Sequence, residues 1–220
     1  MSSGHFKHDL FNQFARIGKA LSNGNRLELL EFLSQSERSV DELAGISGLS
    51  VANTSQHLQL LRQSGLVTSR KDGLKVFYKV SNGDVIDLLN KLRKVAEREL
   101  ADVNLLLNTY LTVKDNLEPI AREELLNRVA DGLVSVLDVR PTEEYEVGHI
   151  PGAVNIPLPE LQKHLDEFDS EKEVVAYCRG PHCVLAFDAV AELRKHGLNA
   201  RRLEDGFPEW KQAGMPVEQQ

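Results

Sequence analysis

The sequence predicts two domains, a mainly α domain with a short β-hairpin followed by an α/β domain with a mainly parallel sheet. The chain has 220 residues, which is long for one domain and comfortable for two. After Tyr110 the pattern changes from helical spacing to an alternation of helical and β-rich runs. The charge divides as well: residues 1–108 carry 14 Lys and Arg against 12 Asp and Glu, whereas residues 109–220 carry 12 against 21.

The composition, 41% hydrophobic and 27% charged, is that of an ordinary globular protein. There is no run of about 18 apolar residues, and the amino terminus lacks the apolar core of a signal peptide. We therefore expect a cytoplasmic protein with no membrane partner. Thiols are kept reduced in that compartment, so the two cysteines are expected to serve catalytic, redox or metal chemistry rather than a structural disulfide.

The first half begins with two helical patterns separated by the turn-like SNGN at 22–25. Apolar residues recur at helical spacing in the first pattern, at Leu10, Phe11, Phe14, Ile17 and Leu21. Two shorter helical patterns follow in VDELAGISGLSVANTSQHLQLLRQSGLV, separated by the turn SGLS, with Ser50 as the expected N-cap of the second. Two helices joined by a tight glycine turn predict a helix-turn-helix.

The second helix of this pair has an outer face suited to reading DNA. The face expected to be buried holds Val51, Thr54, Leu58 and Leu61. The opposite face is small, polar and barely charged, and amide and hydroxyl groups donate to and accept from base edges in a major groove. With the N-cap, the candidate DNA-binding residues are Ser50, Asn53, Ser55, Gln56, Gln59 and Arg62. A solvated helix face is the alternative interpretation.

A basic hairpin follows this helix. In LVTSRKDGLKVFYKV two β-rich runs flank Asp72-Gly73, which is a strong hairpin signal. Phosphate contacts are made along such a hairpin without reading sequence, and it carries positive charge at Arg70, Lys71, Lys75 and Lys79. Of these, Arg70, Lys71 and Lys75 are the candidate DNA-binding residues. A helix-turn-helix followed by a basic hairpin predicts a winged helix.

Over roughly residues 10–108 the chain resembles the ArsR family of winged-helix repressors. The likeness is carried by the run LSVANTSQHLQLLRQSGLV and by a short basic hairpin ending in FYKV. It implies a homodimeric regulator that binds double-stranded operator DNA, commonly as a repressor released by a signal. It also implies a dimer interface built from the first helix and a long helix, for which an apolar stripe from Val85 to Tyr110 is suited.

The chain departs from that family at the metal-sensing positions. Metal-sensing members carry cysteines in the first helix of the helix-turn-helix, where this chain has ERSVDEL at 37–43. Others carry acidic and histidine ligands on the long helix, where this chain has no histidine. His5 and His8 alone are a weak ligand set. We therefore expect no metal site, and a signal that enters elsewhere.

The second half is expected to form a mainly parallel sheet with helices on both sides. Ligands of such sheets bind at the carboxyl ends of the strands. The strand EVVAYC ends there, the loop CRGPHC contains both cysteines, and a helix is expected to begin near Cys183. The amino terminus of that helix and the cation of Arg179 both favour the thiolate of Cys178. Backbone N–H groups are expected to form an anion-binding nest, from Arg179, Gly180, His182 and Cys183.

Over about residues 117–218 the chain resembles the rhodanese family of sulfurtransferases. Three ordered motifs carry the likeness: the signature DVRPTEEYEVGHIPGAVNIPL, the six-residue active-site loop CRGPHC and the closing segment LEDGFPEWKQAGMPVE. The resemblance implies that Cys178 accepts sulfur from a small donor such as thiosulfate or polysulfide, and it implies no cofactor. Asp138, Arg140 and His149 match signature positions that shape or support the site, with a structural role expected for each.

Several alternatives stay open at this loop. A phosphatase or arsenate reductase of related fold needs an arginine six residues after Cys178, where this chain has Val184. Cys183 either resolves a sulfur adduct on Cys178 by forming a disulfide or is an inert helix-start residue. A zinc site from Cys178, His182 and Cys183 would be crowded and short of a ligand. Cys178 as a buried, space-filling cysteine is the structural alternative.

Together these features predict a DNA-binding transcriptional regulator, as a repressor, whose rhodanese domain senses or transfers sulfane sulfur through a persulfide on Cys178. The expected parts are a DNA-binding and dimerisation domain at 1–108, a linker at 109–116 and a rhodanese-like domain at 117–220. The alternative function is a metabolic sulfurtransferase whose winged helix serves for dimerisation or docking. Thiosulfate-type sulfurtransferase activity is compatible with both.

Overall fold

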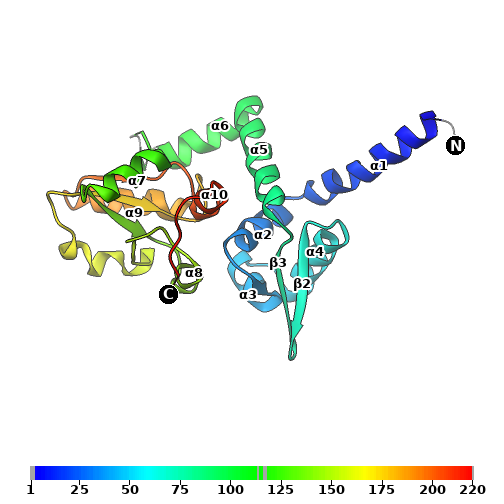
Figure 1. The fold of residues 1–220 in the computed structure, drawn as a ribbon, viewed down its shortest axis with the longest axis horizontal. Helices are drawn as coiled ribbons and strands as arrows, with labels where there is room; N and C mark the ends of the chain where they lie inside the picture. Colours follow the sequence, from blue (N-terminus) through cyan, green and yellow to red (C-terminus); the bar gives the residue numbers. More distant parts are fainter. Residues whose placement is uncertain (1–2, 113, 116–117, 220) are drawn as a thin grey trace. The chain divides into compact units, whose positions relative to one another are not determined.

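The computed structural model describes residues 3–112, 114–115 and 118–219 (Figure 1). The chain divides into two compact units, Met1–Asn90 and Lys91–Gln220, each with its own sheet and hydrophobic core. Val113, Asn116 and Leu117, which belong to the segment LTVKDNLEP between the predicted domains, lie outside the described residues. Among the residues described, no helix has the length and apolar character needed to cross a membrane.

The first unit is mainly helical and carries a three-stranded antiparallel sheet of order β1-β3-β2. Its core is formed by buried side chains of the helices and of β3, among them Leu29, Leu30, Leu43, Leu58, Leu61 and Tyr78. Its elements are α1 (Ser3–Leu21), α2 (Gly24–Gln35), β1 (Arg38–Ser39), α3 (Val40–Ser47), α4 (Val51–Gln63), β2 (Val67–Asp72), β3 (Lys75–Val80) and the first part of α5 (Gly83–Glu99). The predicted winged helix-turn-helix is confirmed.

The turn between α3 and α4 forms as the sequence predicts. Gly48 has a φ of 69°, in the left-handed region that glycine enters without the steric cost of a side chain. The Ser50 side chain accepts a hydrogen bond from the backbone N–H of Asn53, so its expected N-cap role is confirmed. Because helical side chains tilt toward the helix amino terminus, Val51 in the first turn points past the core and is 51% exposed, so its predicted burial was wrong.

The basic hairpin is also confirmed. Strands β2 and β3 pair in antiparallel register from Val67↔Val80 to Asp72↔Lys75, which leaves Gly73 and Leu74 at the tip. Gly73 has a φ of 58°, a backbone conformation that favours glycine.

The predicted long helix is interrupted. α5 ends at Glu99, Leu100 has an extended backbone with φ −108° and ψ 107°, and the chain continues as α6 (Ala101–Leu107) and a π-helical turn, η1 (Asn108–Thr112). The side-chain amide of Asn104 donates to the carbonyl oxygen of Glu97 at 2.6 Å, giving a partner to a carbonyl at the end of α5. The expectation of one apolar stripe running to Tyr110 was therefore wrong.

The second unit is built on a four-stranded sheet of order β5-β4-β6-β7, in which every described strand pairing is parallel. The run PELQKHLDEF forms most of two short 3₁₀ helices. The elements after η1 are α7 (Arg122–Ala130), β4 (Val134–Asp138), α8 (Thr142–Val147), β5 (Val154–Asn155), η2 (Leu158–Lys163), η3 (Leu165–Glu167), β6 (Glu173–Tyr177), α9 (Val184–Lys195), β7 (Ala200–Arg202) and α10 (Phe207–Gln212). The predicted α/β class is confirmed.

Alternating side chains of the two central strands enter different cores. Along β6 and the residue after it, Val174, Ala176 and Cys178 pack with α9, η2 and η3. Val175 and Tyr177 pack with α7, α8 and α10 instead. This period of two is what a strand covered on both faces requires. It places the Cys178 side chain on the α9 side of the sheet.

Candidate functional site

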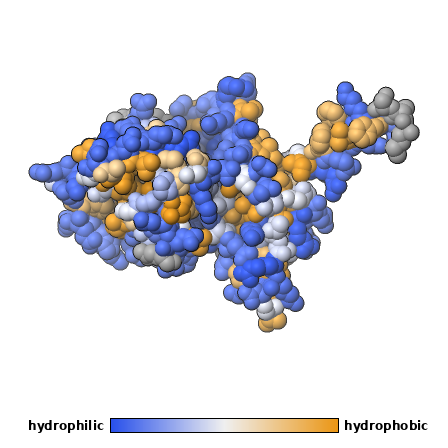
Figure 2. All heavy atoms as spheres, in the orientation of Figure 1, coloured by the Kyte–Doolittle hydropathy of each residue, from blue (hydrophilic) through white to orange (hydrophobic). Residues whose placement is uncertain are grey.

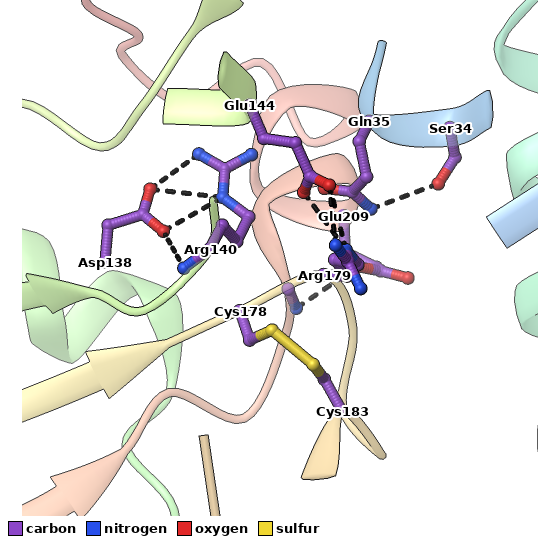
Figure 3. The surroundings of a disulfide bond; sticks show 10 residues. Ser34, Gln35, Asp138, Arg140, Glu144, Cys178, Arg179, Cys183 and Glu209 are labelled. Atoms are coloured by element: carbon purple, nitrogen blue, oxygen red, sulfur yellow. Dashed lines mark hydrogen bonds and ion pairs between the residues drawn. A yellow bond between two sulfur atoms is a disulfide. The ribbon is translucent and has the colours of Figure 1, made fainter. Parts of the chain in front are cut away.

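The two cysteines lie at the ends of one short loop. Cys178 follows β6 and is 1% exposed, and Cys183 is the N-cap residue of α9, so the predicted helix start is confirmed. Their sulfur atoms form a disulfide (Figure 3), with the Cα atoms 6.1 Å apart. The backbone N–H of Cys183 donates to the carbonyl oxygen of Gly180 at 3.1 Å, so this member of the expected nest is engaged within the loop.

Arg179 points from the loop to a buried carboxylate (Figure 3). Its Nε and Nη2 atoms donate to Oε1 of Glu144 at 3.0 and 2.8 Å, and Glu144, on α8, is fully buried. The cation expected to favour the Cys178 thiolate is therefore paired with an anion. In the reduced state, the positive amino-terminal end of α9 is left as the main local feature that favours the thiolate.

The closing segment packs directly on this loop at Gly206. A Cβ atom at position 206 would lie 2.3 Å from the backbone nitrogen of Gly180 and 2.4 Å from the carbonyl carbon of Arg179. The next residue, Phe207, donates its backbone N–H to the carbonyl oxygen of Cys178 at 3.0 Å. Only glycine allows this close approach of two backbones.

Asp138 and Arg140 form an ion pair that is wholly buried (Figure 3). Arg140 Nη2 lies 2.6 Å from Asp138 Oδ2 and also donates to the carbonyl oxygen of Gly148 at 2.8 Å. The Arg140 guanidinium lies 4.3 Å from the ring centre of Phe207. The pair therefore connects the end of β4 with the turn at Gly148 and with the closing segment.

His149 lies in the same supporting region rather than in the cysteine loop. Its ring stacks on Tyr145 at 3.7 Å between centres, and its Nδ1 atom lies 2.9 Å from the carbonyl oxygen of Tyr145. The Tyr145 hydroxyl in turn donates to the carbonyl oxygen of Ala153 at 2.8 Å. These contacts fix the chain that follows α8.

His182 is held by a side chain from the end of α5, within the unit Lys91–Gln220. Its Nε2 atom lies 3.2 Å from Oε1 of Glu97. Burial lowers the pKa of His182, and the Glu97 carboxylate opposes that shift only in part. The ring is therefore neutral at neutral pH, and its Nε2 atom lies beside the Glu97 carboxylate. Within the described ranges, no group of three or more His, Cys, Asp or Glu side chains could hold a metal ion.

Two families match the chain. The bacterial regulatory protein, arsR family, matches residues 23–69, and the rhodanese-like domain matches residues 121–213. The HTH-type transcriptional regulator Rv0324 of Mycobacterium tuberculosis is 44% identical over 213 residues, which cover 97% of this chain and 93% of the relative. The chain belongs to the ArsR-family transcriptional regulators with a carboxyl-terminal rhodanese-like domain.

Other proteins are similar to one half of this ArsR-family regulator. The uncharacterized protein YqhL of Bacillus subtilis is 33% identical over 46% of this chain and 79% of its own length. The homodimeric winged helix-turn-helix DNA-binding domain Mb0332 of Mycobacterium bovis is 37% identical over 46% of this chain and 93% of that chain, with a TM-score of 0.42. A rhodanese-related protein of Thermoplasma volcanium is 29% identical over 47% of this chain and 100% of that chain, with a TM-score of 0.43.

The candidate DNA-reading face of this regulator is largely open. Asn53, Gln56, Gln59 and Arg62 are exposed on α4, and Ser55 is half-buried. Arg62 Nη1 donates to Ser69 Oγ at 3.2 Å, which links the end of α4 to the wing. Ser50 is committed to its capping hydrogen bond.

The wing cations of the regulator differ in their surroundings. Arg70 lies 2.6 Å from Glu37 Oε2 and 2.9 Å from Asp72 Oδ2, and its guanidinium stacks on Phe77. Lys71 and Lys75 are exposed. Arg70 is therefore partly neutralised by neighbours, whereas the two lysines project their charge into solvent.

Two residues of the rhodanese-like domain were missed by the sequence reasoning, Glu144 and Gly206. Both lie inside the rhodanese-like motifs. Glu144 in TEEYE has the sequence context of an exposed helix, and Gly206 in LEDGF has that of a loop, so neither residue stood out. The partner of each, Arg179 or Gly180, comes from a distant part of the chain, so local pattern carried no signal for either contact.

Proposed function

We propose that this regulator is a DNA-binding repressor whose rhodanese-like domain reads sulfane sulfur through Cys178 and Cys183. The observation that carries the proposal is the disulfide that joins the end of β6 to the start of α9. It places a second thiol within reach of any sulfur bound to Cys178. The positive end of α9 supports the thiolate form that such chemistry requires.

The proposed reaction has two steps. The Cys178 thiolate attacks the outer sulfur of thiosulfate, the sulfur–sulfur bond breaks, and sulfite leaves while a persulfide remains on Cys178. The Cys183 thiolate then attacks the inner sulfur of that persulfide, forms the disulfide and expels hydrosulfide. The two thiols are oxidised, and the sulfane sulfur is reduced to sulfide. A polysulfide donor enters in the same way, with a shorter polysulfide as leaving group.

Dimerisation through α1 and α5 belongs to the same proposal. Large apolar side chains of α1 are uncovered in the single chain (Figure 2), among them Phe6 at 61% and Phe11 and Phe14 at 58% exposure. Leu88, Leu92 and Val95 of α5 are also exposed. Such faces are typical of a surface that meets a second copy. The homodimeric relative from Mycobacterium bovis supports the same assembly.

The decisive experiment measures DNA affinity with and without a polysulfide donor, on a fragment from upstream of the protein's own coding sequence. We expect the wild type to change its affinity about tenfold, which corresponds to about 1.4 kcal/mol of coupling. Cys178→Ser should show no change, because the sulfur acceptor is gone. Cys183→Ser should still accept sulfur but lose the change in affinity, because no disulfide can form.

Three results would count against the proposal or one of its steps. If the wild type binds DNA but polysulfide does not change its affinity, the cysteine loop does not regulate DNA binding. A protein that turns over thiosulfate but binds no DNA even at low salt would favour the metabolic sulfurtransferase. If Cys183→Ser responds like the wild type, the persulfide on Cys178 is itself the signal and the disulfide step is wrong.

Lys71→Ala in the wing should weaken DNA binding by a similar factor for all sequences. It should also lower the slope of log affinity against log salt by about 0.9, as expected for one lost phosphate contact. Arg70→Ala should have a smaller effect, since Arg70 is paired with Glu37 and Asp72. Gln56→Ala should alter sequence preference instead.

Gel-shift titrations over a range of salt concentrations measure the wing effect. The matched control is Lys172→Ala, which removes an exposed lysine from the rhodanese-like domain and should leave both affinity and slope unchanged. Equal slopes for wild type and Lys71→Ala would mean that the wing does not contact phosphate.

A further inference from the structure

Lys114 and Asp115 are tied to the body of the second unit, although they lie in the segment predicted to be a linker. Lys114 Nζ lies 2.6 Å from Asp188 Oδ1, and Asp115 Oδ1 lies 2.8 Å from Arg194 Nη1. The other oxygen of Asp115 lies 3.1 Å from Arg202 Nε, and the Asp115 side chain is 1% exposed. We call these five side chains the linker latch.

Helix α9 connects the latch to the cysteine loop. Cys183 is its N-cap residue, Asp188 lies in its second turn and Arg194 in its last. The helix has 12 residues and is therefore about 18 Å long. It is packed against the sheet by Ala186, Ala189, Val190 and Leu193, all buried. Since a packed helix moves as one body, a displacement at Cys183 reaches Asp188 and Arg194 together.

Arg202 gives the latch a fixed point on the sheet. It is the last residue of β7 and pairs in parallel register with Ala176 of β6. Asp115 is thus held between Arg194 of α9, whose Nε atom also donates to the carbonyl oxygen of Ala200 at 2.8 Å, and Arg202 of β7. Separating the two arginines would leave the buried Asp115 carboxylate with one cationic partner instead of two. A buried charge that loses a partner costs free energy, because little water is present to solvate it. The latch therefore responds to the position of α9.

We propose that the linker latch transmits the sulfur state of the loop to the segment that follows η1 within the second unit, an inference that rests on the function proposed for the loop. In the disulfide state the end of β6 and the start of α9 are tied together, and the latch is closed. A dithiol or phosphine reductant supplies two electrons, and with two protons the disulfide becomes two thiols. The tie is then lost, α9 gains freedom to shift as one body, and the latch opens more often.

Hydrogen exchange measured by mass spectrometry on the full chain tests the latch directly. In the peptide that contains Lys114 and Asp115, exchange should be about threefold or more faster after reduction by a phosphine than in the disulfide state, because local opening exposes its amides. In Cys183→Ser the exchange should be fast with or without the reductant. Equal exchange of the wild type in both states would overturn the proposal.

Asp115→Asn tests whether the latch carries the signal. Cys178 of this variant should still accept sulfur. The amides near position 115 should exchange fast in both the disulfide and the reduced state, and DNA affinity should lose its tenfold response to polysulfide. The matched control is Glu118→Gln, an exposed acidic residue close by, which should behave like the wild type. Asp188→Asn removes only the more exposed ion pair of the latch, between Lys114 and Asp188. It replaces Asp115→Asn in the test if that variant does not fold, and it should reduce the response of DNA affinity in part.

The failures of the two proposals are distinguishable. If Asp115→Asn and Asp188→Asn both keep the full DNA response, the latch is wrong and the function proposed for the loop stands. If the wild type shows no DNA response while exchange near Asp115 follows the state of the disulfide, the latch stands as a structural link and the proposed regulation fails.

Discussion

Cys178→Ser should abolish the transfer of sulfur from thiosulfate to cyanide. The serine hydroxyl is not ionised at neutral pH and does not attack a sulfane sulfur, so the first step has no nucleophile. Cys183 does not replace Cys178, because it lies at the other end of the loop as the N-cap residue of α9, whereas Cys178 directly follows β6. Intact-protein mass spectrometry soon after thiosulfate is added, before Cys183 resolves the adduct, should show one added sulfur atom on the reduced wild type and none on the variant.

Cys183→Ser is the matched control for this experiment. It retains the acceptor and removes the resolving thiol, so its sulfur adduct should last longer than that of the wild type. A sulfur adduct that persists on Cys178→Ser at a site other than Cys183 would show that the acceptor has been assigned to the wrong residue. Equal turnover by Cys178→Ser and the wild type would remove the loop from the chemistry altogether.

Asp138→Asn should lower the free energy of unfolding of the second unit by about 3–5 kcal/mol, as expected when one partner of a buried ion pair is removed. Arg140 is fully buried and would be left with an uncompensated charge beside Phe207. The chain has one tryptophan, Trp210, which is fully buried in α10 of that unit. Its fluorescence during urea denaturation therefore reports on the second unit.

Two variants decide what the loss means. Glu143→Gln removes an exposed carboxylate five residues away and should leave the unfolding midpoint unchanged. Combining Asp138→Asn with Arg140→Met removes both charges and should recover much of the lost stability, because no buried charge is left unpaired. If Asp138→Asn unfolds at the same urea concentration as the wild type, the ion pair does not support the fold as described.

The sequence alone determined much of this protein. Gly48, Ser50 and Gly65 act on their own backbones, so local chemistry predicts the ends of α3 and α4. The hairpin around Gly73 and the strand ending at Tyr177 are equally local. These elements also place Cys178 after a strand and Cys183 at the start of a helix. The sequence motifs of the two halves indicated the families.

Contacts between distant segments were decided only by the tertiary structure. Glu144 meets Arg179 across 35 residues, Gly206 meets Gly180, and Asp115 meets Arg194 across 79 residues. The exposure of Val51 was also decided by the tertiary structure, since apolar periodicity does not show which side chains the neighbouring elements cover. The break of the long helix at Leu100 is a similar case, because periodicity does not show where a helix ends. Local chemistry acts within a turn or two, whereas burial and ion pairing depend on which segments the completed fold brings together.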